Sequence, residues 1–487
     1  MAEDKPSGNE NRSTTPLSPE FREFIGANWA EPVIQRVASD QSEYAAARRA
    51  RLAEQIPGLA LVIPAGSPKQ RSNDTDYPYR AHSAFSYFTG WASDTVPGSV
   101  LVIDGTGAAT TTTLYYRYPA GRGTDEFFAN TEVGEFWIGP RPTPESVSSA
   151  LGIHCAPIDE LDDAITGLRD TAALAVIREA DPTLTARIDD IRADIEAVVG
   201  RDAELSRLAS EMRLIKDDYE IDQMRKAVAA TGHGFSDVIA DLPQIVAHPR
   251  GERLVEGTFN RRARADGNTV GYDTIAASGP HACILHWTRN DGPVTPGDLI
   301  LMDAGVELDS LYTADITRTL PVSGTFTEVQ REVYQTVLDA ADAAFAIVRP
   351  GIVFREIHAA AMAVIADRTA AWGFLPVSAA EALRPELQFH RRYMVHGTSH
   401  HVGIDVHDCA QARRVMYMDG VVAEGMIFTI EPGLYFQPDD LSVPAEFRGI
   451  GVRIEDNILV TATGAENLSI GIPRTADDVE AWLKAQR

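Results

Sequence analysis

Short apolar runs alternate with polar, helix-like stretches along the first part of the chain, from about residue 19 to residue 205. The runs LALVIPAG at 59–66 and SVLVID at 99–104 have the length and the aliphatic content of buried strands. Their alternation with helical stretches predicts an N-terminal α/β domain over 19–205. Residues 1–18 are rich in Ser, Thr, Pro, Asn and charged residues, which predicts a disordered tail because such a segment buries too little apolar area.

The pattern changes near residue 206, where a charged helical stretch leads to signals that start helices. Asp217 with Glu220, and later Thr327 with Gln330, have the spacing of a capping box, which predicts that a helix begins at each site. Three later apolar runs have the length of strands, namely DLILMDAGV at 298–306, MIFTIEPGLY at 426–435 and GIGVRIEDNILVTA at 449–462. We therefore predict a second domain over 206–487 and an α/β (α+β) fold class for the chain.

Length, charge and cysteine content narrow the classes of function. A chain of 487 residues exceeds what one hydrophobic core usually organises, which favours two domains. The formal net charge of −26 argues against nucleic acid and anionic membrane partners, because both would be repelled. The first residues show no basic start followed by an apolar stretch, and no apolar run reaches about 18 residues, so we expect neither a signal peptide nor a membrane span. The 3 cysteines are widely spaced without a CxxC motif, so we expect reduced thiols in a cytoplasmic protein.

Carboxylates stand at the ends of strand-like runs in the second domain. They are Asp303 in LMDAG, Asp315 in TADITRT, Glu431 in TIEPG and Glu455 in RIEDN. A single aspartate after a strand is usually a turn former or a helix cap, but a set of such residues would need charge partners if buried. With one imidazole, this set carries the negative charge that two divalent cations would balance, so it predicts a two-metal hydrolytic site.

Histidines cluster in the segment HGTSHHVGIDVHD, which lies between Asp315 and Glu431. This segment holds His396, His400, His401 and His407, out of 12 histidines in the chain. A lone histidine is more often a satisfied core or surface group, whereas a cluster followed by strand-borne glutamates indicates metal binding or proton transfer. The segment can therefore supply the imidazole that the carboxylates lack.

These motifs occur together in one known family. In chain order, ILHW, MDAG, DITRT, HGTSHHVGIDVHD, EPGLY and RGIGVRIEDN resemble the motifs of the aminopeptidase P branch of the pita-bread metallopeptidases, which also include prolidase and methionine aminopeptidase. The resemblance covers about residues 210–485, and RSNDTDYPYRAHSAFSYFTGW at 71–91 is similar to the start of the aminopeptidase P N-terminal domain. It implies a C-terminal pita-bread domain and a dinuclear-metal Xaa-Pro aminopeptidase, a hydrolase that releases the N-terminal residue from peptides with proline in second position.

The resemblance also implies a role for each site residue. Two divalent metal ions, typically manganese with cobalt or zinc also compatible, would be bound by Asp303, Asp315, His400, Glu431 and Glu455. The catalytic set would be His286, His396, His407 and Glu431, in which Glu431 moves the proton to the leaving nitrogen while His286 and His407 stabilise the tetrahedral intermediate. The surface that receives the proline ring would consist of His286, His396, Tyr435 and Arg453.

Other residues bear on assembly and on departures from the family pattern. Trp137 in EFWIGPRP, and similarly Asp74, matches a residue that reaches an active site in the family's oligomers, so the resemblance implies a homodimer or homotetramer. An ordinary aromatic residue packed in its own domain is the alternative for Trp137. His401 stands where an aromatic residue is common in bacterial members, which leaves open an exchange of roles with His400.

Alternatives to an Xaa-Pro aminopeptidase remain open from the sequence. A prolidase, which cleaves Xaa-Pro dipeptides, differs in the reach of its substrate cleft, and loops set that reach. A non-catalytic pita-bread binding protein, or a metal-free amidinohydrolase like creatinase, typically lacks metal ligands that this chain has. In either peptidase case the partners are proline-containing peptides, with neither nucleic acid nor a membrane expected.

Overall fold

The computed structural model describes residues 14–31, 33–34, 36–73, 75–168, 174–192 and 195–486. It divides into two compact units, residues 1–209 and 210–487, named here the N-terminal unit and the C-terminal unit. Of the predicted disordered tail, residues 1–13 lie outside the described residues. Ser18, the last residue of that tail, caps helix α1 (Pro19–Gly26) by accepting a hydrogen bond from the backbone of Phe21 at 3.2 Å.

A mixed five-stranded sheet forms the centre of the N-terminal unit, in the order β6-β5-β4-β1-β7. Its strands are β1 (Ala60–Pro64), β4 (Val100–Asp104), β5 (Thr111–Tyr116), β6 (His154–Pro157) and β7 (Leu174–Val176). The runs predicted as strands at 59–66 and 99–104 are β1 and β4, which pair antiparallel with Leu61 opposite Ile103. β1 also pairs in parallel with β7, and such parallel pairs need crossover helices, as the predicted α/β domain requires.

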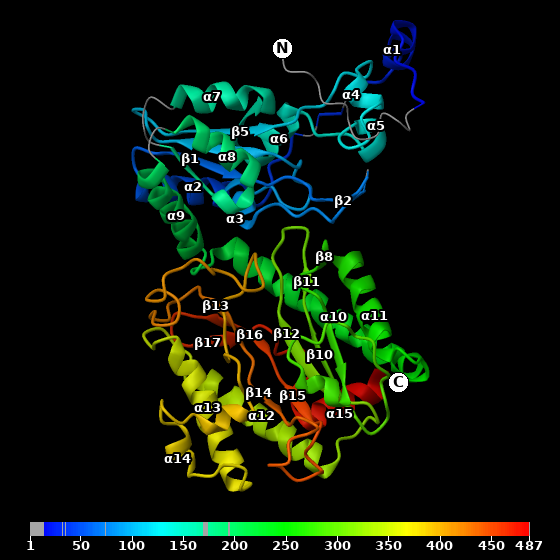
Figure 1. The fold of residues 1–487 in the computed structure, drawn as a ribbon, viewed down its shortest axis with the longest axis vertical. Helices are drawn as coiled ribbons and strands as arrows, with labels where there is room; N and C mark the ends of the chain where they lie inside the picture. The colour runs from blue at the N-terminus through cyan, green and yellow to red at the C-terminus, as the bar shows by residue number, and fades with distance from the viewer. Residues whose placement is uncertain are drawn as a thin grey trace. The chain divides into compact units, whose positions relative to one another are not determined.

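Helices cover this sheet, and their apolar side chains complete its core. They are α2 (Ser42–Gln55), α3 (Ser83–Thr89), α6 (Pro144–Leu151), α7 (Leu161–Leu168), α8 (Pro182–Ile191) and α9 (Ile195–Met212), with the short α4 (Asp125–Phe128) and α5 (Glu135–Ile138) beside them. Val62 and Val102 point to the face where Ile165 of α7 and Ile188 of α8 pack. In Figure 1, α2 and α3 lie on the opposite face of the sheet. A separate hairpin is made by β2 (Gln70–Ser72) and β3 (Thr75–Asp76).

Long helices frame the C-terminal unit. They are α10 (Asp218–Ala247), α11 (Gly251–Asp266), α12 (Glu328–Ala346), α13 (Arg355–Ala371) and α15 (Ala476–Gln486), with the short α14 (Ala379–Ala382). Both predicted capping boxes are confirmed, at Asp217 with Glu220 before α10 and at Thr327 with Gln330 before α12. In each box the side chains satisfy backbone N–H groups that the first turn of a helix leaves free.

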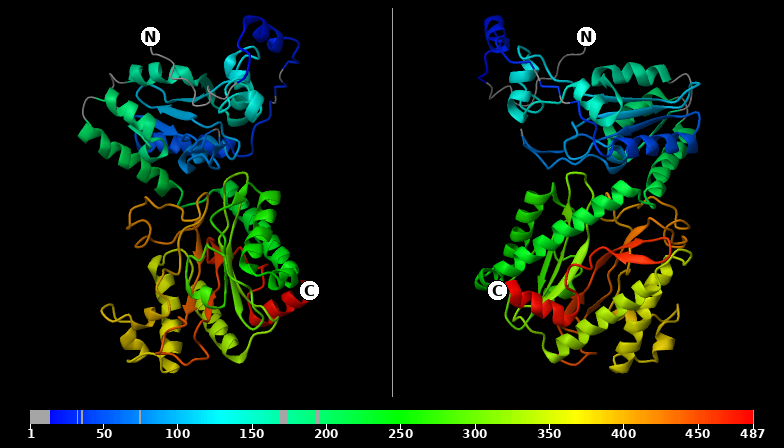
Figure 2. Two further views of the ribbon diagram at one scale, coloured as in Figure 1. Left: turned by 45° about the vertical axis from the view of Figure 1, so that its right-hand side comes forward. Right: turned by 180° about the vertical axis from the view of Figure 1, so that it is seen from behind.

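Short strands fill the middle of the C-terminal unit. They are β8 (Thr269–Val270), β9 (Ile275–Ser278), β10 (Leu299–Ala304), β11 (Val306–Glu307), β12 (Ile316–Pro321), β13 (Ile427–Ile430), β14 (Gly433–Tyr435), β15 (Gly451–Arg453), β16 (Asp456–Val460) and β17 (Ala465–Asn467). They form the sheets β12-β10-β9 and β13-β16-β17 and the pairs β14-β15 and β11-β8. In Figures 1 and 2 these strands lie between α10 and α11 on one side and α12 and α13 on the other.

Breaks in two predicted apolar runs carry glutamates. The run at 426–435 divides into β13 and β14 around Glu431 and Pro432, and the run at 449–462 divides into β15 and β16 around Glu455. Because β13 pairs antiparallel with β16 and β14 with β15, the two breaks lie opposite each other. The paired ribbon therefore changes direction at one place, where both glutamates leave the regular pleat.

Side-chain burial supports the separate core of the C-terminal unit. Phe235 of α10, Ile300 of β10, Val337 of α12 and Ile365 of α13 are all completely buried in one apolar cluster. No helix within the described parts of the chain combines the length and apolarity that crossing a bilayer requires.

Candidate active site

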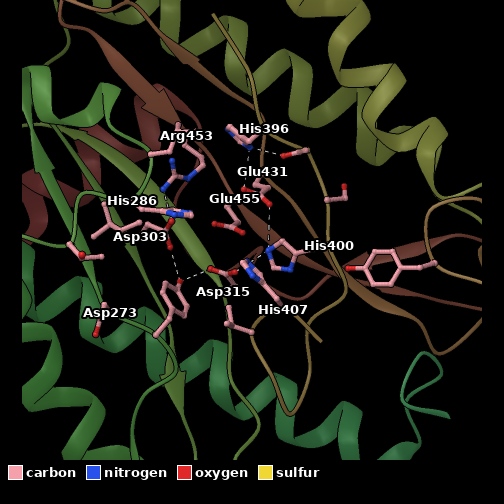
Figure 3. A pocket seen from close by; sticks show the side chains of 18 residues that line it. Asp273, His286, Asp303, Asp315, His396, His400, His407, Glu431, Arg453 and Glu455 are labelled. Atoms are coloured by element: carbon pink, nitrogen blue, oxygen red, sulfur yellow. Dashed lines mark hydrogen bonds and ion pairs between the residues drawn. The ribbon is translucent and has the colours of Figure 1, made fainter. Parts of the chain in front are cut away.

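The predicted metal-binding residues meet in one cavity of about 600 Å³ in the C-terminal unit (Figure 3). Asp303 is near the end of β10 and Asp315 immediately precedes β12, so the antiparallel pairing of these strands brings the two aspartates together. Glu431 and Glu455 enter the same cavity from the opposed breaks in the β13–β16 and β14–β15 ribbon. The local sequence thus places the carboxylates at strand ends, and the pairing of the strands brings these ends together.

His400 completes this group from the loop that holds the histidine cluster. Its backbone N–H donates to the Thr429 hydroxyl at 3.1 Å, and its carbonyl accepts from the Thr429 N–H at 2.9 Å. These bonds fix the loop alongside β13. The His400 Nε2 atom consequently lies 3.2 Å from Asp315 Oδ2 and 3.4 Å from Glu431 Oε1.

The donor atoms have the spacing of metal ligands. Among the residues that the structure describes, three sets have potential ligand atoms that all lie within 4.8 Å of one another inside each set, and they are Asp303–Asp315–Glu455, His400–Glu431–Glu455 and Asp315–His400–His407. The sets share members, so they describe one continuous group of oxygen donors with imidazole at one end. Carboxylate oxygens with few nitrogens suit divalent cations of the harder kind.

The electrostatics of this group also fit bound cations. Burial, reinforced by the neighbouring carboxylates, raises the pKa of Glu431 to about 7 and raises that of Glu455 well above its usual range. Burial alone would lower the pKa of His400, but the adjoining Asp315 and Glu431 carboxylates raise it to about 9. The raised pKa values of Glu431 and Glu455 mean that the ionised carboxylates lack enough positive charge nearby to stabilise them. Divalent cations would supply that charge.

A chain of hydrogen bonds connects the predicted substrate-binding residues to the metal-binding group. The His396 Nε2 atom lies 2.8 Å from the Tyr435 hydroxyl, to which Arg453 also donates at 3.1 Å. The same guanidinium donates to Asp303 Oδ2 at 2.5 Å and to the Thr317 hydroxyl at 3.1 Å. His396 and Arg453 line the cavity, and the buried Tyr435 joins them through its hydroxyl, which holds this part of the cavity in one arrangement.

His286 and His407 both line the cavity from exposed loop positions. His286 lies in the loop between β9 and β10 and, in Figure 3, beside Arg453 and Asp303. The ring of His407 meets the His400 ring edge to face, with 4.4 Å between the ring centroids. The structure therefore brings together every residue that the sequence assigned to catalysis, substrate binding or metal binding.

His401 occupies a different environment from its neighbour His400. Its side chain is buried, and its ring stacks on Phe354 at 4.9 Å and meets Tyr417 edge to face at 4.7 Å. Burial lowers the pKa of His401 to about 3, so the ring is neutral. His401 thus packs as the aromatic residue that the family pattern carries there, and it is His400 that faces the carboxylates.

Tyr272 and Thr317 belong to the site but were missed from the sequence. The Tyr272 hydroxyl lies 2.7 Å from Asp303 Oδ1 and 2.5 Å from Asp315 Oδ1, and the Thr317 hydroxyl donates to Glu455 Oε2 at 2.7 Å. Thr317 stands two residues after Asp315 in the DITRT motif, and the alternation of a strand gave a usable signal for it. Tyr272 precedes β9 without any such signal, because only sheet pairing brings it to the aspartates.

Trp137 lies in the N-terminal unit, on the short helix α5. Its side chain is 53% exposed between Phe136 and Ile138, which are 62% and 59% exposed. Its indole N–H donates to the Phe128 carbonyl at 2.8 Å, which holds the ring in place. Asp74, the other residue linked to assembly, lies outside the described residues.

Comparisons with known proteins agree with this geometry. The profile of Metallopeptidase family M24 matches residues 222–462, and that of the Aminopeptidase P, N-terminal domain matches residues 45–176. The chain is 47% identical over 474 residues to Xaa-Pro aminopeptidase 2 of Streptomyces coelicolor, with 96% of each chain covered. It is 32% identical over 455 residues to Xaa-Pro aminopeptidase of Escherichia coli, covering 90% of this chain and 97% of the relative.

Solved structures give the same result. A substrate complex of an Escherichia coli aminopeptidase P variant superposes with a TM-score of 0.77 at 30% identity, covering 93% of this chain and 99% of that one. Pseudomonas aeruginosa aminopeptidase PepP superposes with a TM-score of 0.78 at 29% identity, covering 92% and 99%. The predicted order, an N-terminal α/β domain followed by a pita-bread metallopeptidase domain, is confirmed. The chain belongs to the aminopeptidase P group of metallopeptidase family M24, and it is a metal-dependent exopeptidase.

Proposed function

We propose that this enzyme releases the N-terminal residue from peptides whose second residue is proline. The observation that supports this most directly is one cavity in which the metal-binding group adjoins the chain His396–Tyr435–Arg453. Relatives that share 47% identity over 96% of the chain carry the name Xaa-Pro aminopeptidase. A proline nitrogen has no N–H and its ring fixes the backbone, so a cavity shaped for that ring is required.

Two divalent ions are proposed to be held by Asp303, Asp315, His400, Glu431 and Glu455. Manganese is proposed as the native metal because the donors are carboxylate oxygens with a single imidazole, although cobalt or zinc would also fit. When bound, such cations supply a water that is nucleophilic near neutral pH and a positive charge that polarises the scissile carbonyl. All other steps fall to the side chains around the cavity.

Glu431 is proposed to carry the proton from the attacking water to the leaving proline nitrogen. Its Oε2 atom lies 3.7 Å from His396 Nδ1 in the same cavity, which places this carboxylate beside the proposed substrate-binding surface. His286 and His407 reach the cavity from separate loops and are proposed to donate hydrogen bonds to the oxyanion of the tetrahedral intermediate. Each is at an exposed loop position, where it can meet substrate directly.

His286, His396, Tyr435 and Arg453 are proposed to form the surface that receives the proline ring. The bonds between His396 and Tyr435 and between Tyr435 and Arg453 hold these groups before substrate arrives. A preformed surface limits the ordering that binding requires, and that favours a rigid cyclic residue over a flexible one. The positive amine of the substrate would be attracted by the carboxylate-rich part of the cavity.

Hydrolysis of Xaa-Pro-Yaa tripeptides against matched Xaa-Ala-Yaa tripeptides tests the proposal, before and after manganese is added to chelator-treated protein. Release of the first residue only from the proline series, and only with metal, is the expected result. Cleavage of both series at equal rates would refute the proline preference. No cleavage by fully metallated protein would refute peptidase activity and favour a non-catalytic binding protein.

A prolidase is the second candidate function, because it would use the same metal-binding residues. A series of substrates from Xaa-Pro to longer Xaa-Pro-Yaa peptides separates the two. A strict prolidase would cleave the dipeptide and ignore the tripeptide, whereas the proposed aminopeptidase cleaves the longer peptides. The relatives named Xaa-Pro aminopeptidase favour the latter.

A homodimer or homotetramer in the cytoplasm is proposed as the working form. The exposed Phe136–Trp137–Ile138 segment supports assembly, since contiguous exposed apolar side chains mark interaction surfaces. Cys155, Cys283 and Cys409 are buried and unpaired, as expected in a reducing compartment. Sedimentation velocity should give a dimer or tetramer for the wild type and a smaller species for Trp137→Ser, and a monomeric wild type would refute the assembly.

A further inference from the structure

The loop that carries His286 is held from behind by a buried carboxylate. It joins β9 to β10, and residues 279–292 of it form no strand. Glu252, in the first turn of α11, is completely buried beneath this loop. A carboxylate at that depth would be costly unless its oxygens were fully hydrogen-bonded.

Both oxygens of Glu252 are fully used, and every donor comes from the loop or its edges. Oε1 accepts from the Ser278 N–H at 2.8 Å and lies 2.7 Å from His281 Nδ1. Oε2 accepts from the Gly292 N–H at 2.7 Å and from the Trp287 indole N–H at 2.9 Å. The carboxylate thus holds the loop at its start, at Gly292 and at the residue that follows His286.

Packing around Glu252 reinforces this arrangement. The His281 and Trp287 rings stack with 3.9 Å between centroids, so the two side chains that bond to the carboxylate also support each other. A side chain at Gly292 would come within 2.8 Å of Glu252 Oε2 and 2.7 Å of His281, so the backbone reaches the carboxylate only because residue 292 is glycine. The hydrogen bonds and the ring stack together restrain the loop against Glu252.

Asn290 fixes the same loop by a second, independent set of bonds. It is completely buried with a φ of 47°, its amide oxygen accepts from the Ala276 N–H at 3.0 Å, and its amide nitrogen donates to the Thr274 carbonyl at 2.8 Å. Its amide nitrogen also donates to Glu256 of α11 at 3.1 Å. One turn of α11 therefore supplies both carboxylates that hold this loop against the C-terminal unit.

We propose that Glu252 is a positioning residue that sets the place of His286 in the active site through the β9–β10 loop. The inference rests on the role proposed above for His286 in stabilising the tetrahedral intermediate. Glu252 touches neither substrate nor metal-binding residues, because its bonding capacity is used by Ser278, His281, Trp287 and Gly292. It acts by restricting the loop, so its removal should affect the transition state more than substrate binding.

The variant Glu252→Gln gives the sharpest test. An amide must turn its NH₂ group toward one of the two pairs of donors, so at least one backbone N–H loses its acceptor while side-chain volume is unchanged. With Ala-Pro-Ala as substrate, we expect kcat to fall by about 10- to 100-fold and KM to rise by a smaller factor, because His286 also belongs to the proposed proline surface. Metal content should stay at the wild-type value.

A double-mutant cycle separates positioning from general damage. His286→Ala should lower kcat by about 100-fold, and adding Glu252→Gln to it should lower kcat by less than about threefold more, because both changes act through the same imidazole. Equal factors from Glu252→Gln in the two backgrounds would overturn the inference. So would a wild-type kcat in the single variant.

Hydrogen exchange of residues 278–292 tests the loop restraint even if peptidase activity is absent. Glu252→Gln should increase exchange at Ser278 or at Gly292, whichever N–H group faces the new NH₂ group and loses its acceptor. Unchanged exchange at both positions would overturn the restraint. A wild-type enzyme without peptidase activity would refute the proposed function instead, and a His286→Ala variant at full rate would refute the role proposed for His286 and the inference that rests on it. If Glu252→Gln fails to fold, Trp287→Phe removes one donor, keeps the ring, and should lower kcat by a smaller factor in the same direction.

Asp202→Asn is the matched control. Asp202 is a buried carboxylate of the N-terminal unit that accepts from the Val176 N–H at 2.8 Å and is paired with Arg192 at 2.8 Å. Its replacement should lower the melting temperature without raising exchange in residues 278–292. An increase in that segment like the one expected for Glu252→Gln would mean that general loosening, rather than the Glu252 bonds, controls the loop.

Discussion

The ammonium group of Lys216 lies 3.1 Å from Oδ2 of Asp408, and both side chains are buried. Lys216 also donates to the Arg213 carbonyl at 2.8 Å, and Asp408 directly follows His407 in the chain. A side chain at Gly403 would come within 2.6 Å of Asp408 Oδ2, so the histidine-rich loop is closed tightly over the pair. This ion pair therefore holds the loop that carries His407 against the first residues of the C-terminal unit.

Lys216→Met should destabilise the protein by about 3 kcal/mol, because Asp408 would stay buried with less positive charge beside it. Urea unfolding measures the loss. Lys226→Met is the matched control, since Lys226 pairs with Asp222 at 2.6 Å while both side chains are more than half exposed. That change should cost less than about 0.5 kcal/mol. Equal losses of unfolding free energy in the two variants would mean that the buried ion pair stabilises the protein no more than the exposed one.

Glu455→Gln should reduce the metal content and lower kcat/KM by more than about 100-fold, because Glu455 belongs to two of the three sets of potential ligand atoms. Metal analysis of the purified variant by mass spectrometry gives the first quantity. Asp273→Asn is the control, because Asp273 lines the same cavity but belongs to none of these sets within the described residues. It should keep the wild-type metal content, and a comparable loss there would indicate that overall negative charge, rather than coordination, retains the ions.

Stabilisation by manganese should increase as pH rises from 5.5 to 7.5. Burial raises the pKa of Glu431 from 4.5 to about 7 in the metal-free protein, so the folded state holds a proton that the unfolded chain releases. The stability of the metal-free protein therefore falls as pH rises between these values, whereas bound cations remove the need for that proton. Thermal unfolding of chelator-treated protein, with manganese or with potassium chloride at equal ionic strength, checks this. An equal or smaller manganese effect at pH 7.5 would contradict it.

The sequence was most informative where function restricts residue type at a strand end. Asp303, Asp315, Glu431 and Glu455 could be recognised because charged residues that end apolar runs need an explanation. Placing His400 with them required the family resemblance, since the spacing along the chain says nothing about which strands pair. The capping boxes were recognisable for a local reason, because both partners lie within one helical turn.

Residues that act through tertiary pairing were beyond the reach of sequence patterns. Tyr272 contacts both aspartates only because β9 pairs with β10, which pairs with β12. Glu252 had the appearance of an ordinary first-turn acid, which usually faces solvent and favours the helix dipole. The break in the ribbon at Glu431 was also hidden, because MIFTIEPGLY reads as one strand until Pro432 is weighed as a residue without an N–H.

His401→Phe should stabilise the protein by about 0.5–1.5 kcal/mol, because a buried imidazole with weak hydrogen bonding would become a ring of similar shape. Neither ring nitrogen of His401 makes a hydrogen bond of normal geometry, and the Ile427 backbone interacts with the ring only weakly. Phenylalanine would keep the stack on Phe354. It would also keep the hydrogen bond that the backbone N–H of residue 401 donates to the Tyr417 hydroxyl.

His390→Phe is the matched substitution, and its effect should have the opposite sign. His390 is also completely buried, but its Nδ1 atom lies 3.0 Å from the Ala382 carbonyl, which would lose its partner in the variant. We expect His390→Phe to lower the free energy of unfolding by about 1–3 kcal/mol, whereas His401→Phe should raise it, and urea unfolding measures both. Equal destabilisation of both variants would mean that the fit of the ring, and not its hydrogen bonding, determines the free energy of unfolding at these positions. The presence of His401 in the aromatic core would then require a polar partner for its ring.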